Sequence, residues 1–207
     1  QHGVTHTASV MAQGFNPYVA EWSPYHGAAY AVIEATARLV AAGANWSKAR
    51  FSYQEYFERM DKQAERFGQP VAALLGSIEA QIQLGLPSIG GKDSMSGTFE
   101  ELTVPPTLVA FGVTTADSRK VLSPEFKTAG ENIYYIPGQV LSAEIDFDLI
   151  KSNFAQFEAL QKAHKVTSAS AVKYGGVVES LALATFGNHI GAEVTLSELE
   201  SSLTAQL

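Results

Sequence analysis

Apolar residues recur at helical spacing in the first quarter of the chain. Ser23 and Pro24 predict a helix start, because a serine hydroxyl caps the first turn and proline fits its first position. Apolar positions three or four residues apart then continue to about Ala42, and Gly43 is expected to end the helix. Residues 23–43 therefore predict one amphipathic helix.

Four further segments show the same periodicity. Residues 56–68 predict an exposed amphipathic helix that ends at Gly68, and residues 70–85 predict a second, mostly buried helix that begins with proline. Residues 145–165 predict a long amphipathic helix, and residues 175–191 another. The last of these is expected to close at Gly187.

Strand-like patterns lie between these helices. Residues 106–117 form the strongest strand signal, with β-branched and aromatic residues between turn signals, and residues 131–138 form a second. Residues 49–57 alternate as a strand or a sheet edge would, and residues 192–196 predict a strand before a short helix at 197–203. Because strands and helices alternate, the fold class is α/β or α+β with mixed sheets.

Composition narrows the function classes. The chain has 207 residues, a net charge of -7 and no run of Lys and Arg, which argues against a nucleic-acid partner. It has no Cys, so it has no disulfide, cysteine-based metal site or cysteine nucleophile, and we expect it to be cytoplasmic. Glu34 and Arg38 interrupt the longest apolar region, so no membrane span or membrane partner is expected.

The first candidate site is the sequence "GGKDS", residues 90–94, which follows an apolar run. Gly90 and Gly91 would let backbone N–H groups approach phosphate oxygens, Lys92 would add positive charge, and Asp93 could hold Mg²⁺ beside Ser94. A polar loop with a solvated Lys-Asp pair explains the same residues, and both interpretations stay open. The spacing is not that of a Walker A loop.

The second candidate is Glu34, which stands alone on an apolar helical face. Carboxylates seldom lie there unless they are paired or bind a metal. Arg38 lies four residues further on, so an ion pair within the helix is an alternative to a metal site. The five histidines share no spacing typical of a metal site.

Several motifs together resemble phosphoribosylformylglycinamidine synthase, a family in the aminoimidazole ribonucleotide synthetase superfamily. They are "SPYHGAAYAVIEATARLVAAGAN", "FSYQEYFER", "PSIGGKDSMSGTF", "VPPTLVAFGVTTAD" and "SPEFKTAGENIYYI". "GGKDSMS" is typical of the large, single-chain form. The resemblance implies an ATP-dependent C–N ligase of purine biosynthesis, which converts formylglycinamide ribonucleotide, glutamine and ATP to the amidine, glutamate, ADP and phosphate.

The resemblance also implies a domain organisation. Residues 1–140 would be an ATP-binding domain that is incomplete at its N-terminus, and residues 141–207 would begin the second domain. The first residue is Gln, so we expect a fragment that is inactive alone. Its partners would be the remaining domains of the synthase, namely a pseudo-symmetric half and a glutaminase domain. The alternative is a non-catalytic scaffold or a structural nucleotide-binding half.

The implied site residues agree with the family only in part. Glu34 stands where relatives have a glutamate that binds Mg²⁺, and residues 91–94 match their "GKDS". Arg38, however, replaces an Asn or Asp ligand, Ala171 replaces a metal-binding aspartate, and Lys173 replaces a serine that contacts substrate or nucleotide. ATP and Mg²⁺ are the expected cofactors, although these departures weaken the metal site.

Overall fold

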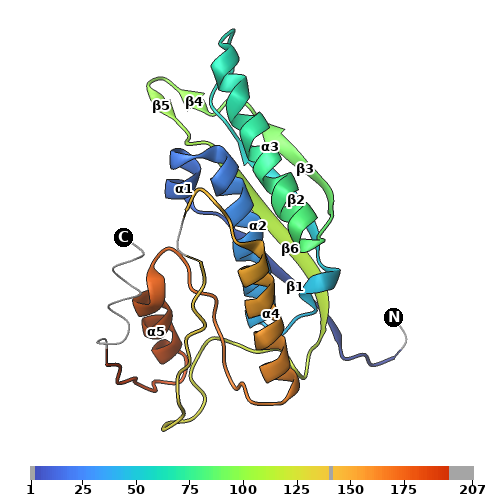
Figure 1. Cartoon of the computed structure of the whole chain (residues 1–207), viewed down its shortest axis with the longest axis vertical. Coiled ribbons are helices and arrows are strands. Elements are labelled where there is room, and N and C mark those ends of the chain that lie inside the picture. The colour runs from blue at the N-terminus through green and yellow to red at the C-terminus, as the bar shows by residue number, and fades with distance from the viewer. Residues whose placement is uncertain (1–2, 140–141, 196–207) are drawn as a thin grey trace. The chain divides into compact units, whose positions relative to one another are not determined.

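A computed structural model of the chain describes residues 3–139 and 142–195 (Figure 1). The chain divides into two compact units, Gln1–Val121 and Leu122–Leu207. The resemblance instead implies a boundary between residues 140 and 141, and that assignment of functional domains stays a prediction. Among the described residues, no helix combines the length and the apolar character that crossing a membrane requires.

The first unit is built on a four-stranded mixed sheet with the strand order β1-β6-β2-β3. β6 pairs antiparallel with both of its neighbours, whereas β2 and β3 are parallel. The strands are β1 (Thr7–Gly14), β2 (Arg50–Tyr56), β3 (Ser88–Ser94) and β6 (Thr107–Asp117). A short hairpin of β4 (Thr98–Phe99) and β5 (Leu102–Thr103) lies between β3 and β6 in the sequence.

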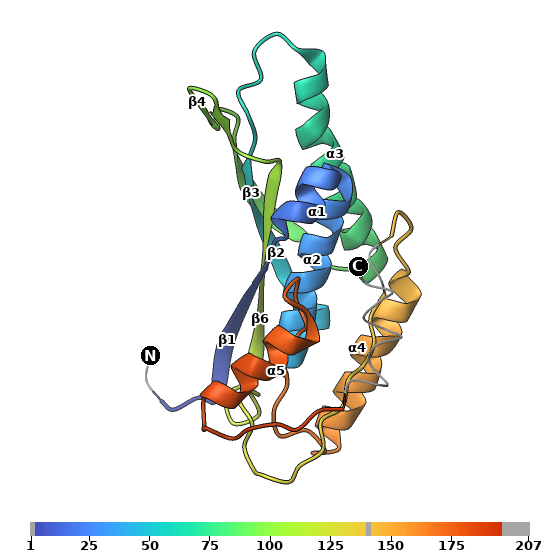
Figure 2. The same cartoon turned by 90° about the vertical axis from the view of Figure 1, so that its left-hand side faces the viewer.

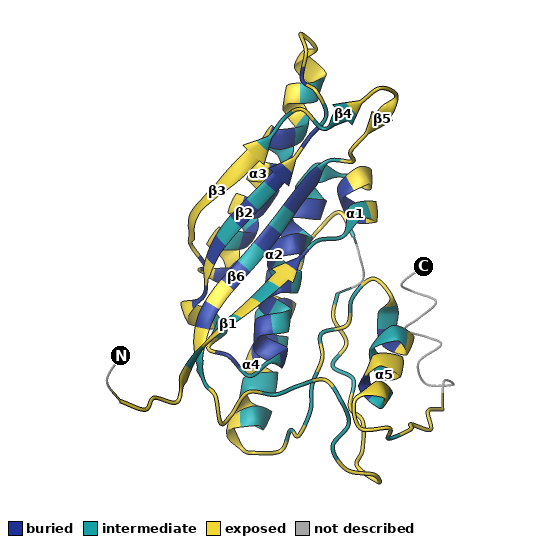
Figure 3. Cartoon of the chain, turned by 180° about the vertical axis from the view of Figure 1, so that it is seen from behind, coloured by how far each residue is buried: buried dark blue, intermediate teal, exposed yellow. Residues whose placement is uncertain are grey.

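Helices cover one side of this sheet (Figure 2). They are α1 (Pro17–Trp22), α2 (Pro24–Ala41) and α3 (Ala64–Leu84), and a 3₁₀ turn, η1, spans Trp46–Lys48. The core lies between the helices and the sheet, where Val32 and Leu39 of α2 and Phe51 of β2 are fully buried. The other side of the sheet carries exposed positions (Figure 3). Met11 on β1 and its partner Val113 on β6 are exposed.

α2 begins and ends close to where the sequence predicts. Ser23 has an extended backbone, and its hydroxyl oxygen accepts a hydrogen bond from the His26 N–H at 3.4 Å, which caps the first turn. At the other end Gly43 has a φ of 74°, a left-handed conformation that glycine adopts without strain. The prediction for residues 23–43 is confirmed.

α3 differs from the prediction, because one helix replaces the two expected ones. It begins at Ala64 and continues through Gly68 and Pro70 to Leu84, followed by Gly85 in a left-handed conformation. It also leaves a row of apolar side chains at least 43% exposed, so it is not mostly buried. These residues are Phe67, Val71, Leu74, Leu75, Ile78 and Ile82.

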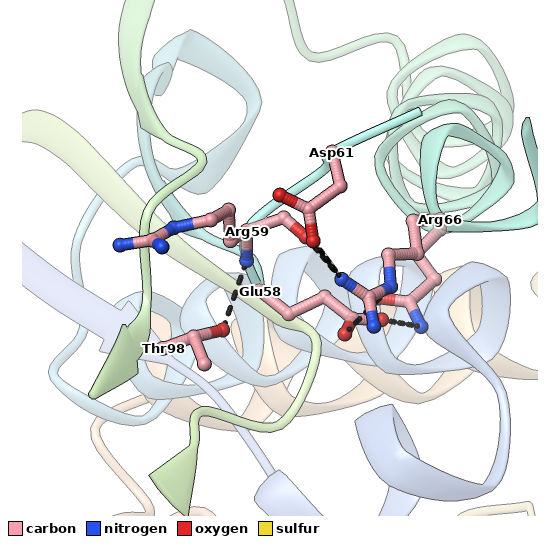
Figure 4. Close-up of polar contacts among 6 residues, drawn as sticks. Glu58, Arg59, Asp61, Arg66 and Thr98 are labelled. Atoms are coloured by element: carbon pink, nitrogen blue, oxygen red, sulfur yellow. Dashed lines mark hydrogen bonds and ion pairs between the residues drawn. The ribbon is translucent and has the colours of Figure 1, made fainter. Parts of the chain in front are cut away.

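Polar contacts explain why α3 starts before the proline (Figure 4). Arg66, in the first turn, lies between two carboxylates, with Nε 3.2 Å from Glu58 Oε2 and Nη1 2.9 Å from Asp61 Oδ2. Gln69 also donates to Glu58 Oε1 at 3.1 Å. These contacts hold the turn ahead of Pro70, although proline removes one helical hydrogen bond and its ring crowds the Arg66 carbonyl.

The strand predictions are confirmed in part. Residues 107–117 form β6, and residues 50–56 form β2, which is an interior strand rather than an edge. The strand predicted at residues 131–138 is wrong, because that segment has no regular secondary structure. β1, which was not predicted, pairs with β6 along its whole length.

The second unit contains α4 (Phe147–Lys162) and α5 (Gly176–Phe186), as predicted. Asp146 caps α4, because its side chain accepts a hydrogen bond from the Leu149 N–H at 2.8 Å. Residues 192–195 are not a strand, and residues 196–203, where the rest of that strand and a short helix were predicted, lie outside the described residues.

Candidate functional site

The "GGKDS" segment is a strand, not the predicted loop. Residues 90–94 belong to β3, which pairs in parallel with β2 on one side and, within the described part of the chain, has no partner strand on the other. The backbone of β3 is therefore held in an extended conformation at the edge of the sheet. Its free edge leaves backbone polar groups available to a ligand or another chain.

The two glycines have structural reasons to be glycine. The β2–β3 register shifts between Phe51 and Ser52, and Gly90 at this irregularity has a φ of 156°, which other residues rarely adopt. A Cβ atom on Gly91 would lie 2.9 Å from the carbonyl oxygen of Tyr53. Both glycines are thus explained by pairing with β2, without a phosphate.

Strand geometry separates the polar side chains of the segment. Gly91 and Asp93 pair with Tyr53 and Glu55, which point to the helix-covered side of the sheet. Lys92 lies between them in the sequence and therefore points to the opposite side. Its ammonium donates to the Asp93 carbonyl oxygen and, at 3.3 Å, to Ser94 Oγ. The segment does not form one cradle from all its side chains, and its nucleotide-binding role stays a prediction.

Glu34 lies on α2 with its charge already compensated. The Phe15 N–H donates to Glu34 Oε2 at 3.3 Å, and Arg38 Nη1 lies 3.8 Å from Oε1. Arg38 also donates to the Gln13 carbonyl oxygen at 2.8 Å, which holds the guanidinium beside the carboxylate. This arrangement does not fit a resident Mg²⁺, since a cationic side chain stands where a further ligand would be needed.

The structure does not bring the two predicted metal ligands together. Glu34 contacts residues at the end of β1, whereas Asp93 is on β3, and these strands are the opposite edges of the sheet. Three strand spacings separate those edges, about 14 Å in all. Within the described ranges there is no group of three or more His, Cys, Asp or Glu residues that could hold a metal ion.

Glu55, a buried carboxylate of the first unit, is a site residue that was not predicted from the sequence. Glu55 is only 1% exposed, and its partner in the β2–β3 register is Asp93. Burial first, and then hydrogen bonding and repulsion from the Asp93 carboxylate, raise the pKa of Glu55 to about 8. The signal was present in "FSYQEY", because Glu55 shares its alternation with the buried Phe51 and Tyr53.

The segment that follows β2 fixes the end of the strand next to Glu55. Besides the contacts of Arg66 with Glu58 and Asp61, the Arg59 N–H donates to Thr98 Oγ1 of β4 at 3.0 Å (Figure 4). Arg66 Nη1 also donates to the Arg59 carbonyl oxygen at 2.7 Å. The contacts tie this segment both to α3 and to the β4–β5 hairpin.

In the second unit, Lys173 has an ion-pair partner. Its Nζ lies 3.5 Å from Oε1 of Glu179 in the first turn of α5. Ala171 lies in the irregular segment that precedes this helix. The ion pair gives Lys173 a structural role, and whether it also contacts a substrate stays a prediction.

No protein-family model matches the chain, and no curated protein sequence matches it. Solved structures do. PurL of Thermotoga maritima complexed with ATP matches with a TM-score of 0.66 and 16% identity, over 86% of this chain and 29% of that chain. The same protein complexed with FGAR matches with a TM-score of 0.62 and 13% identity, over 86% of this chain and 31% of that chain.

Thiamine-monophosphate kinase from Stenotrophomonas maltophilia matches with a TM-score of 0.57 and 12% identity, over 99% of this chain and 71% of that chain. Because the match covers only 29% and 31% of the two PurL chains, this chain spans less than a third of their length. These matches confirm the predicted fold class, a mixed α/β fold that the chain shares with the PurL and thiamine-monophosphate kinase structures.

Proposed function

We propose that this chain is part of an ATP-dependent C–N ligase of purine biosynthesis. The enzyme would convert formylglycinamide ribonucleotide, glutamine and ATP to formylglycinamidine ribonucleotide, glutamate, ADP and phosphate. The observation that carries the proposal is the combination of the "GGKDSMS" sequence, which begins on β3, with a fold shared with PurL. PurL structures with ATP, AMPPCP, ADP and FGAR support a nucleotide-related role.

In this proposal Lys92 is the residue that contacts phosphate. It is exposed on an edge strand, and its ammonium is held by two neutral oxygens, the Asp93 carbonyl and Ser94 Oγ. Phosphate oxygens carry negative charge and are stronger acceptors, so the ammonium would exchange these contacts for a bound phosphate. That contact would steady negative charge while ammonia displaces the phosphate.

A non-catalytic role is the second candidate. The pairing of Glu34 with Arg38 and the structural reasons for Gly90 and Gly91 favour a scaffold that binds nucleotide weakly or not at all. Such a scaffold would pack against a pseudo-symmetric half of the same enzyme, with a glutaminase domain as a further partner. In either case we expect the 207-residue chain alone to be inactive, because it spans less than a third of PurL. Turnover of formylglycinamide ribonucleotide, ATP and ammonia by this chain alone would contradict that expectation.

Replacing Lys92 with methionine in the full-length enzyme tests the catalytic proposal. The change keeps much of the apolar stem and removes a charged contact worth about 1.5–3 kcal/mol. We expect kcat/KM to fall roughly ten- to hundredfold. Steady-state kinetics with ammonia as the nitrogen source measure this effect without the glutaminase reaction.

Lys62→Met is the matched control, because Lys62 is exposed in the turn before α3. It should leave kcat/KM and the melting temperature at wild-type values. Near-wild-type kinetics in Lys92→Met would rule out the phosphate contact and leave the scaffold role. If Lys92→Met lowers the melting temperature markedly as well as kcat/KM, the loss of activity reflects loss of folded protein, and Lys92 is structural.

A further inference from the structure

Three oxygen atoms on the helix-covered side of β2 are buried and, with the carboxyl groups ionised, have no hydrogen-bond partner among the described residues. They are both carboxylate oxygens of Glu55 and the hydroxyl of Tyr53. Glu55 is 1% and Tyr53 8% exposed, so solvent does not satisfy these atoms. A buried carboxylate without a partner is costly, and proteins usually pair such a group or place a metal ion beside it.

Asp93 brings a second carboxylate to the same place. It pairs with Glu55 across two adjacent parallel strands, whose backbones lie about 4.8 Å apart, and both side chains leave the sheet on one side. Asp93 itself is exposed. The pair therefore joins a buried oxygen donor to one that solvent reaches.

Cationic side chains nearby do not neutralise this pair. Within residues 3–139 and 142–195, neither Glu55 nor Asp93 forms an ion pair. Lys92 donates to the Asp93 carbonyl oxygen and to Ser94, and Arg66 is held by Glu58 and Asp61. This is the reverse of Glu34, where Arg38 supplies the positive charge.

We propose that Glu55 and Asp93 together bind a divalent cation at the β2–β3 edge of the sheet. The ion would bridge one carboxylate oxygen of each residue and keep water in its remaining positions. Mg²⁺ fits this description, because it takes oxygen ligands and is commonly held by one or two carboxylates and several waters. Ca²⁺ takes six to eight oxygen ligands, and the described residues offer no third carboxylate at this place.

The competing explanation is a proton in place of the ion. A protonated Glu55 would donate a hydrogen bond to Asp93, and the pair would carry one negative charge instead of two. Burial and Asp93 raise the pKa of Glu55 to about 8, so this form is available when no cation is bound. The site does not depend on the reaction proposed above, since its ligands and its test involve neither ATP nor substrate.

Isothermal titration calorimetry with MgCl₂ at pH 8, after removal of metals with a chelator, tests the proposal. We expect one Mg²⁺ to bind the chain with a Kd of about 1 mM or tighter. Glu55→Gln and Asp93→Asn should each weaken binding by about tenfold or more, since each removes one of two charged ligands. A thermal melt should show a Mg²⁺-dependent rise in the wild type and a smaller rise in both variants.

Two controls separate this site from other acidic groups. Glu34→Gln tests the other predicted metal position, and Glu101→Gln removes an exposed carboxylate after β4. Both should bind Mg²⁺ like the wild type. No Mg²⁺ binding by the wild type, or binding lost only in Glu34→Gln, would overturn the proposal. If Glu55→Gln does not fold, Asp93→Asn still decides the question, because Asp93 is exposed.

Discussion

Glu34 on α2 and Glu55 on β2 are carboxylates on apolar faces of the same unit, and their surroundings are opposite. Glu34 accepts a hydrogen bond from the Phe15 N–H and lies 3.8 Å from the Arg38 guanidinium. Glu55 is 1% exposed, receives no hydrogen bond from an N–H group of the residues that the structure describes, and lies beside a second acid, Asp93. The first carboxylate is compensated within the chain, whereas the second depends on a proton or an ion.

A carboxylate that stands alone among apolar residues in the sequence is therefore not always without a compensating partner in the folded chain. Glu34 stands out because its neighbours on the helix are apolar, but Arg38 one turn away compensates its charge. Glu55 has polar neighbours in "SYQEYF", but strand alternation turns it into the core. Unusual chemistry is therefore expected where the fold, not the local sequence, removes a charge from water.

The largest expected effect is a fall in stability with rising pH that depends on Glu55. Its pKa is about 8 in the folded chain and near 4.5 when unfolded, so the folded state holds the extra proton between these values. The free energy of unfolding should fall by roughly 3–5 kcal/mol from pH 4.5 to pH 8 in metal-free buffer. Glu55→Gln cannot ionise and should remove this part of the fall, as urea denaturation at several pH values would show.

Glu79→Gln provides the control for that experiment. Glu79 is an exposed carboxylate on α3 whose side chain accepts a hydrogen bond from Gln83 at 2.9 Å. Its replacement should leave the slope of stability against pH unchanged. If Glu55→Gln and the wild type show the same slope, Glu55 is not buried in a neutral form.

A smaller effect is expected from the neighbour of Glu55. Asp93→Asn removes a negative charge from the pair, so the pKa of Glu55 should fall below its wild-type value. It should stay above the ordinary value of 4.5, because burial is the largest cause of the shift and remains. The side-chain carboxyl ¹³C shift of Glu55, followed by NMR as pH changes, measures both values. An unchanged pKa would mean that Asp93 does not act on Glu55.

The smallest effect belongs to Glu34 and Arg38. Their side chains are 19% and 37% exposed, so solvent screens the pair, and we expect a coupling of about 0.5–1 kcal/mol. A double-mutant cycle with Glu34→Gln and Arg38→Met measures this coupling from the free energies of unfolding. A coupling well above this range would show that the pair is as consequential for stability as Glu55.

The sequence predicted those elements whose signals are local. α2 begins after the capping residue Ser23 and ends before Gly43, which has a left-handed conformation. β-branched residues mark β6. The predictions were wrong where contacts between residues distant in the sequence decide the secondary structure. Pro70 predicts a helix start, but Arg66, bound to Glu58 and Asp61, extends α3 ahead of it.

The candidate site was predicted only in part, because its structure also depends on contacts between residues distant in the sequence. Residues 90–94 were identified as unusual from composition, but glycines suggest a loop, and only pairing with β2 makes the segment a strand. That pairing sends Lys92 and Asp93 to opposite sides of the sheet, which no local pattern indicates. It also places Asp93 beside Glu55, 38 positions earlier in the sequence.

The sequence by itself determined the mixed α/β class, the positions of α2, β6, α4 and α5, and the resemblance carried by "GGKDSMS". Hydrophobic periodicity, caps and turn residues act over a few positions, so they can be read along the chain. Only the tertiary structure decided that Glu34 is paired and that the buried Glu55 lies beside the exposed Asp93. The electrostatic state of a carboxylate depends on which groups surround it in space, and strand order and register set those neighbours.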